Sequence, residues 1–166
     1  MISRMFNVNN ESEKVFLCNF GGSRSVSEAS GVEQLKKAME FILHDSSIVQ
    51  WPSACAHVSP SSVRIIVERG PVIECRIRFL SFVSIYQYDA RICAFIQQTA
   101  TGSFLCHVIR CEPDAVAFCS TVRAACELRY QQCLDARGTT TKRETVDAQK
   151  RDVQTVNEFW PKENDI

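Results

Sequence analysis

The change in hydrophobic period along the chain constrains its fold more than any other feature. Between residues 54 and 108, apolar residues alternate with more polar ones in short runs, a pattern typical of half-buried antiparallel strands. Turn-forming residues separate several of these runs: Ser59-Pro60, Arg69-Gly70-Pro71 and Thr101-Gly102. From Pro113 the period is that of an amphipathic helix, which is predicted to end at Gly138. The chain must therefore fold as a sheet of several strands covered by one long helix.

Two further elements precede this run. Residues 14–20 predict a first strand, and the Gly-rich segment 21–25 is expected to end it. Apolar residues at helical spacing predict a helix from Val32 to about His44. This order indicates an α+β fold, in which about seven strands form a strongly bent antiparallel sandwich capped by the C-terminal helix. We expect residues 13–137 to form this domain, between a flexible N-terminus (1–12) and a charged, flexible tail (138–166).

Composition and charge bear on the function class. The chain has 19 basic and 19 acidic residues, and this balance gives no support to direct nucleic-acid binding. No run reaches the ~20 apolar residues of a membrane-spanning helix. Residues 1–10 lack the apolar core of a secretory signal. We therefore expect a cytoplasmic protein, with membrane-proximal and nuclear locations left open.

The nine cysteines and three histidines form no recognisable reactive centre. No Cys/His group has zinc-site spacing, and no nucleophile or phosphate-loop motif is present. Cys119, Cys126 and Cys133 recur every seven residues, which places them on one helix face but about 10 Å apart, too far to share a metal. We expect reduced thiols that pack as small core residues, no cofactor, no metal and no enzymatic activity; a redox role stays open.

Three segments carry a family resemblance: Glu74-Cys-Arg-Ile-Arg-Phe-Leu-Ser-Phe82, Cys106-His-Val-Ile-Arg-Cys-Glu-Pro113 and Arg129-Tyr-Gln-Gln-Cys-Leu-Asp-Ala-Arg137. Together they resemble the second phosphotyrosine-binding (PTB) domain of the WW-and-PTB adaptors of the amyloid-precursor-binding family B. The resemblance implies a pleckstrin-homology-like (PH-like) fold and a non-catalytic module. It also implies binding to the Asn-Pro-x-Tyr motif in the cytoplasmic tail of an amyloid-precursor-like membrane protein. Those adaptors also contain a WW domain and a first PTB domain, so we expect this chain to be a fragment or a short isoform.

The resemblance also implies where the peptide binds. An edge strand exposes backbone N–H and C=O groups that an extended peptide can complete as an added strand. This strand is expected at residues 75–82, with the last helix as the other wall of a groove. Many PTB domains have Phe where this helix has Cys126, so the pocket is expected to be shallower. The expected peptide-binding residues are Cys75, Arg76, Ile77, Arg78, Phe79, Leu80, Ser81, Phe82, Val122, Cys126, Arg129, Tyr130 and Cys133.

Other interpretations remain open. Residues 75–82 can be an interior strand and the helix stripe pure core, which would leave no groove. Arg76 and Arg78 can bind phosphate or form a solvated strand face. The main alternative function is a PH-like module that binds phosphoinositide head groups through basic side chains converging at one rim. The candidate rim residues are Arg24, Lys36, Lys37, Arg64, Arg69 and Arg91.

Overall fold

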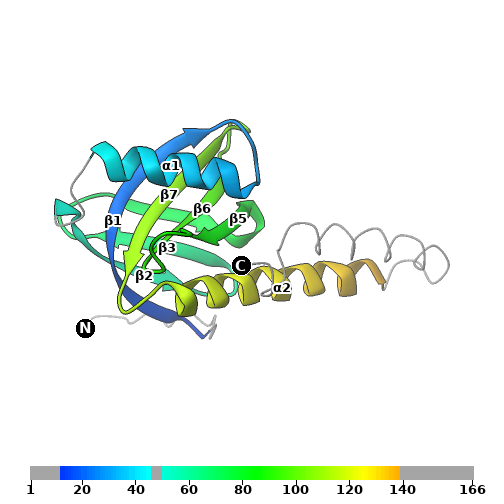
Figure 1. Cartoon of the computed structure of the whole chain (residues 1–166). Helices are drawn as coiled ribbons and strands as arrows, with labels where there is room; N and C mark the ends of the chain where they lie inside the picture. Colours follow the sequence, from blue (N-terminus) through cyan, green and yellow to red (C-terminus); the bar gives the residue numbers. More distant parts are fainter. Residues whose placement is uncertain (1–11, 46–49, 139–166) are drawn as a thin grey trace, which may run out of the picture.

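The structure is a computed structural model, and it describes residues 12–45 and 50–138 (Figure 1). The elements are β1 (Lys14–Val26), α1 (Val32–Asp45), β2 (Ser53–Val58), β3 (Ser62–Val67), β4 (Val72–Arg76), the short 3-10 helix η2 (Ile77–Phe79), β5 (Leu80–Ile85), β6 (Ile92–Gln98), β7 (Phe104–Cys111) and α2 (Val116–Gly138). The N-terminal segment 1–11 and the tail from residue 139 lie outside the described residues. The expected domain limits and the flexibility of both ends stay predictions.

The seven strands of the described residues form one antiparallel sheet in the order β4-β3-β2-β1-β7-β6-β5. The sheet bends strongly, so α2 packs against its inner side and α1 lies across its outer side (Figure 1). The α+β architecture, the helix between β1 and β2 and the long C-terminal helix confirm the fold expected from the sequence.

Two apolar clusters hold these layers together. The inner cluster joins α2 to the inner side of the sheet, and Phe95 and Phe118 are its largest fully buried members. The ring of Phe118 also meets Phe16 edge-on, with 5.7 Å between ring centroids. The outer cluster joins α1, through Leu35 and Met39, to the outer side of β6 and β7. Full burial of one such side chain contributes roughly 1.5–3 kcal/mol, so each helix is fixed to its own side of the sheet.

Two glycines bend β1 where the sequence was expected to end it. The first half of β1 pairs with β2 and the second half with β7, with a register shift between Phe20 and Gly22. A Cβ atom on Gly21 would lie 2.7 Å from the ring of Trp51, and Gly22 has a φ of +132°. Glycine permits both the close ring contact and the bulge. The expected break at residues 21–25 is therefore wrong, because the glycines bend the strand around Trp51 instead.

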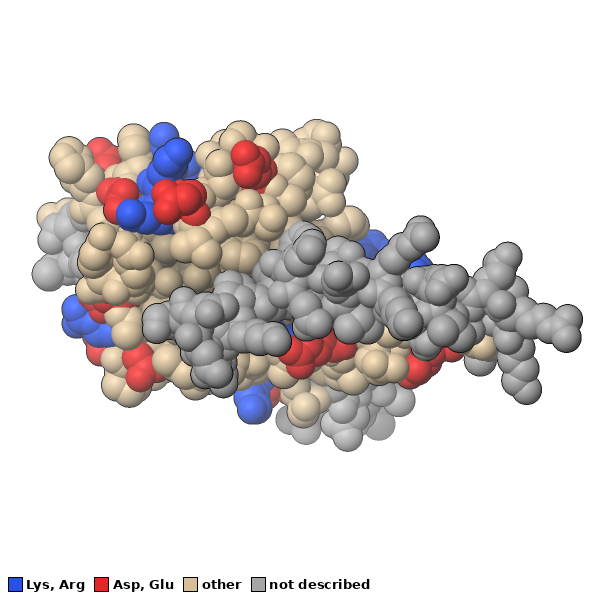
Figure 2. Space-filling model, turned by 45° about the vertical axis from the view of Figure 1, so that its right-hand side comes forward, with Lys and Arg blue, Asp and Glu red and all other residues tan. Residues whose placement is uncertain are grey.

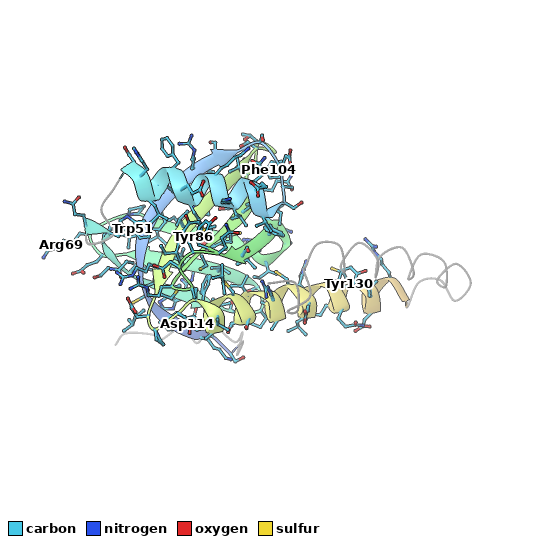
Figure 3. The ribbon with its side chains drawn as sticks, in the orientation of Figure 1. Trp51, Arg69, Tyr86, Phe104, Asp114 and Tyr130 are labelled. Atoms are coloured by element: carbon cyan, nitrogen blue, oxygen red, sulfur yellow. The ribbon has the colours of Figure 1, made fainter. Side chains whose placement is uncertain are left out.

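The start of α2 is set by an acidic side chain. The Asp114 carboxylate oxygen Oδ1 accepts a hydrogen bond from the Val116 backbone N–H at 2.9 Å. A side chain at the helix N-cap satisfies one of the unpaired N–H groups of the first turn. Pro113 therefore precedes the cap, and its expected position as the first helical residue is wrong. Figure 3 shows Asp114 at this end of α2.

Candidate functional site

The described sheet has two end strands, β4 and β5, and each of them pairs with one neighbour only. α2 packs against β5 and against the η2 turn that precedes it (Figure 1). An unpaired strand edge presents backbone donors and acceptors that a further strand can complete. The open edge of β5 and the adjoining side of α2 are together called the β5–α2 site below.

The backbone of β5 offers pairing groups at alternate residues. β5 pairs with β6, and the Tyr86 N–H just after it donates to the carbonyl of Ile92 at 2.8 Å. Hydrogen-bonded and non-hydrogen-bonded positions alternate along an antiparallel ladder. This alternation turns the N–H and C=O groups of Val83 and Ile85 toward the open edge, where an added strand can reach them.

Local hydrogen bonds occupy the start of β5. The Leu80 N–H donates to the carbonyl of Ile77 and closes η2, so this donor is already used. A register shift falls between Leu80 and Phe82, and the Ser81 hydroxyl donates to the carbonyl of Ile96 at 3.2 Å. The regular part of the open edge therefore begins after Ser81.

The α2 side of the site changes from buried to exposed along the helix. Val122 has no exposed surface and belongs to the inner cluster. Cys126 is half-buried at the margin of that cluster, as is Ile85 of β5. Further on, Tyr130 is half-buried and Cys133 exposed, on the part of α2 that extends past the sheet (Figure 3). The site thus has an apolar floor beside the open edge and a more solvated outer end.

The thiol of Cys126 is not activated as a nucleophile. Burial raises its pKa to about 12, so it is protonated at neutral pH. Burial raises the pKa of Cys18, Cys75 and Cys106 to about 12 as well. All nine cysteines are free thiols, and six of them are buried, as expected of packing residues, whereas Cys133 is exposed.

The expectation of one continuous strand over residues 75–82 is wrong. Cys75 and Arg76 end β4, residues 77–79 form η2, and residues 80–82 begin β5. The reason is topological, because β4 and β5 are opposite ends of the sheet order and the chain has to cross between them. The crossing takes a single 3-10 turn.

The side chains of this segment lie in different surroundings. Cys75, Ile77 and Leu80 are buried in the inner cluster, whereas Phe82 is buried in the outer one. Ser81 is half-buried, and Arg76, Arg78 and Phe79 are exposed. The Arg78 guanidinium lies 4.7 Å from the centre of the Phe79 ring.

The structure brings only part of the expected set together at the β5–α2 site. From the strand half these are Leu80, Ser81 and Phe82, the first residues of β5; from the helix half they are Val122, Cys126 and, further out, Arg129, Tyr130 and Cys133. Arg129 is exposed. The role of all these residues in binding a peptide stays a prediction.

Sequence reasoning missed Val83, Ser84 and Ile85, which form the regular part of the open edge. A signal was present, because Leu-Ser-Phe-Val-Ser-Ile is a short apolar run before the turn at Gln87. Because Cys75, Ile77 and Phe79 alternate with arginines, the strand was expected to begin at residue 75, before the actual start of β5 at Leu80. A three-residue 3-10 turn is too short to produce a period of its own.

A series of hydrogen bonds through buried His107 connects strands near this site. The Ser23 hydroxyl lies 2.6 Å from His107 Nδ1, and His107 Nε2 lies 2.9 Å from the side-chain oxygen of Gln97. The Gln97 amide nitrogen in turn donates to the carbonyl of Glu74 at 3.2 Å. These hydrogen bonds connect β1, β7, β6 and β4. They lie near the start of β5, because Gln97 is opposite Leu80.

These contacts define the protonation of His107. The Gln97 oxygen can only accept, so Nε2 carries the proton and Nδ1 accepts from the Ser23 hydroxyl. Burial lowers the pKa of His107 to about 4, so the ring is neutral at physiological pH. A neutral, fully paired histidine in this position is a structural element.

The described residues contain no group of three or more His, Cys, Asp or Glu side chains that could hold a metal ion. Within residues 12–45 and 50–138, no helix has the length and hydrophobicity to cross a membrane.

The basic residues considered for the phosphoinositide alternative are spread over several elements. Arg24 of β1 lies 3.4 Å from the ring centre of Phe41 on α1. Arg64 of β3 is paired with Glu13, and Arg91 of the β5–β6 connection with Asp89. On the face shown in Figure 2, Lys and Arg side chains are interspersed with Asp and Glu. This arrangement gives the lipid alternative no specific support.

Comparison with known proteins places these features in context. The family model for the phosphotyrosine interaction domain (PTB/PID) matches residues 19–136. The Protein Fe65 homolog of Caenorhabditis elegans is 42% identical over 127 residues, which are 76% of this chain and 19% of that protein. The mouse Amyloid-beta A4 precursor protein-binding family B member 3 is 30% identical over 122 residues, 69% of this chain and 25% of that protein. This chain thus spans about a fifth to a quarter of these curated relatives.

A solved structure agrees over the same region. The solution structure of the C-terminal phosphotyrosine interaction domain of mouse APBB2 matches with a TM-score of 0.69 and 34% sequence identity. The match covers 76% of this chain and 95% of that structure.

Proposed function

The chain belongs to the phosphotyrosine interaction domain (PTB/PID) family, and on that premise we propose that it is a non-catalytic adaptor module for Asn-Pro-x-Tyr peptides. Its ligand is the cytoplasmic tail of an amyloid-precursor-like membrane protein. The observation that supports this most is the open edge of β5 lying directly beside α2, with half-buried Ile85 and Cys126 at the margin of the core.

The backbone of β5 supplies the sequence-independent part of binding. The peptide adds to the sheet as a further antiparallel or parallel strand and pairs with the outward N–H and C=O groups of Val83 and Ile85. These groups belong to a rigid sheet, so little order has to be created on the domain side when the ligand binds.

The apolar floor supplies the sequence-dependent part. Pro fixes φ and Asn favours turns, so an Asn-Pro-x-Tyr segment ends the added strand with a turn. The turn brings the ligand Tyr to α2 near Cys126, whose protonated thiol offers a small apolar surface.

The names of the relatives support the choice of partner. Two of them are called Amyloid-beta A4 precursor protein-binding, in rat and in mouse. We extend this binding to the present chain and place its action on the cytoplasmic side of the membrane, where such a tail is found.

Calorimetry with a tail peptide tests the proposal. Micromolar affinity requires about 8 kcal/mol, which one short added strand and two buried side chains can supply. We expect saturable heat with a peptide that contains Asn-Pro-x-Tyr, and a loss of at least about tenfold when its Tyr is replaced by Ala, because about 1.4 kcal/mol of ring burial is removed. A folded domain that gives no heat with the motif, or equal heat with both peptides, contradicts it.

A further inference from the structure

A row of apolar side chains crosses the outer side of four neighbouring strands. Leu17 of β1 is opposite Cys55 of β2, Cys55 is opposite Ile66 of β3, and Ile66 is opposite Val72 of β4. We call these four residues the outer row. Leu17 is 77% exposed, Val72 62% and Ile66 38%, while Cys55 is half-buried between them.

The outer row borders a hollow in the surface. The hollow has a volume of about 730 Å³, and Leu17, Cys55, Ile66 and Glu68 are among the residues that line it. The hollow is separate from the β5–α2 site, because none of its lining residues belongs to β5 or α2.

This part of the sheet lacks the cover that the other part has. On the same outer side, α1 covers β6 and β7 by packing Leu35 and Met39 against residues such as Ala94 and Val108. No described element covers the outer row. An antiparallel sheet that faces water on one side normally presents polar residues there, so a contiguous apolar row indicates an interaction surface.

The chain enters the structure beside this row. The Glu13 carboxylate lies 3.2 Å from His57 Nδ1 on β2 and 3.1 Å from Arg64 Nη2 on β3. Val15, His57 and Arg64 are opposite one another on the outer side, two residues along the strands from the outer row. The contacts of Glu13 therefore fix the chain at residue 13 over this face, and residues 1–11 are attached at its border.

We propose that the N-terminal segment 1–11 of this chain docks on the outer row and the adjoining hollow. Five of its eleven residues are apolar: Met1, Ile2, Met5, Phe6 and Val8. Eleven residues reach up to about 36 Å when extended, whereas the row spans three strand spacings, about 14 Å. Arg4 of the segment complements Glu68 at the hollow.

The covalent connection favours this occupant over others. A segment tethered at the border of its site has an effective concentration in the millimolar range, so modest apolar contacts suffice to hold it there. The tail after Gly138 starts instead from the far end of α2, which extends away from the sheet (Figure 1).

Cys55 lies between Leu17 and Ile66 in the row, so the reactivity of its thiol shows whether a docked segment covers the row. Alkylation by iodoacetamide, resolved for each cysteine by peptide mass spectrometry, compares the 1–166 chain with a deletion of residues 1–11. Exposed Cys133 on α2 is the internal reference. We expect the deletion to speed up Cys55 alkylation about tenfold, equivalent to about 1.4 kcal/mol of docking free energy, and to leave the Cys133 rate unchanged.

Point variants keep the test independent of the deletion's effect on folding. Phe6→Ser weakens the segment and Leu17→Thr weakens the row at an exposed strand position, so each should speed up Cys55 alkylation and lower the melting temperature by only a few degrees, as the loss of the docking free energy requires. Deletion of residues 139–166 is the matched control and should have no effect. The proposal is overturned if Cys55 reacts equally fast with and without residues 1–11. It is also overturned if the tail deletion exposes Cys55, or if protection rises with protein concentration, which would indicate the tail or a second copy as the occupant.

Discussion

At the residue scale, three cysteines mark the transition from core to surface along one face of α2. Cys119 is 1% exposed, Cys126 is half-buried and Cys133 is exposed. The same substitution therefore has a different meaning at each position, and a comparison of the three separates the core from the proposed binding surface.

The series Cys119→Arg, Cys126→Arg and Cys133→Arg uses this gradient. We expect Cys119→Arg to unfold the domain, because a buried unpaired charge costs several kcal/mol. Cys126→Arg should abolish peptide binding with a smaller loss of stability, because its long side chain can reach solvent from the margin of the core. Cys133→Arg should only weaken binding. Thermal midpoint and peptide affinity decide this together; if all three variants unfold, the face of α2 is core and carries no site.

His107 provides a second test at this scale, through pH. Its pKa is about 4 in the folded chain, below the ordinary value of 6.5, because burial disfavours the charged ring. Between these two values the unfolded chain binds a proton that the folded chain excludes, so stability falls as pH is lowered through this window. Through His107 alone, the free energy of unfolding falls by about 2 kcal/mol when the pH is lowered from 7 to 5.

Urea unfolding at pH 7 and pH 5 measures this contribution. His107→Gln should lose about 2 kcal/mol less than the wild type on this change of pH, because the replaced side chain no longer titrates. Gln98→Asn, a change at an exposed position that has no titrating group, is the control and should keep the wild-type pH dependence. If His107→Gln keeps the wild-type pH dependence, this ring takes up its proton equally readily in the folded and the unfolded chain, and the burial argument is contradicted.

At the element scale, the proposed peptide binding depends on β5 as an open edge. Pro removes one N–H and is tolerated in a sheet where that N–H faces outward. Ile85→Pro should therefore leave the β5–β6 ladder in place but remove a donor to the added strand, and peptide affinity should fall at least about tenfold, the equivalent of one lost backbone pair.

Two matched variants separate this effect from the loss of the side chain. Ile85→Val keeps the N–H and should bind almost normally. Ser84→Pro interrupts the ladder to β6 and should lower the melting temperature. Leu80 is unsuitable for this purpose, because its N–H closes the η2 turn. If Ile85→Pro binds as tightly as Ile85→Val, the peptide does not pair with β5.

The elements also show where sequence reasoning stops. The α1 helix and the turns at Ser59-Pro60, Arg69-Gly70-Pro71 and Thr101-Gly102 follow from hydrophobic period and turn residues, and the structure confirms them. The pair Gly21-Gly22 is ambiguous in sequence, because glycine both ends strands and permits bulges, and the contact with distant Trp51 decides between them. The alternation of apolar residues with Arg76 and Arg78 is equally ambiguous, because it fits both one continuous strand and two strands joined by a short turn. The choice depends on the crossing from β4 to β5, which is a property of the whole sheet.

At the scale of the whole molecule, period and composition predict a sheet covered by a helix, but not the strand order. The order β4-β3-β2-β1-β7-β6-β5 depends on which strands meet after the bend in β1, and local sequence does not encode that choice. The family resemblance implied the fold that the structure has, and it led to β5 and α2 as the proposed site. The resemblance placed the peptide-pairing strand at residues 75–82, too early in the sequence. A matching motif identifies a segment of the chain, but it does not show which residues of that segment have unpaired backbone groups.

The central claim is that a tail peptide adds to β5 and contacts α2. Titration of the isotope-labelled chain with an Asn-Pro-x-Tyr peptide, followed by NMR through backbone amide shifts, tests it most directly. The account predicts that the largest shifts fall on residues 82–86 and on α2 between Val122 and Cys133, while β2 and β3 change little. Largest shifts on the outer row, on η2 alone or at the α1 surface, or no shifts at saturating peptide, would contradict it.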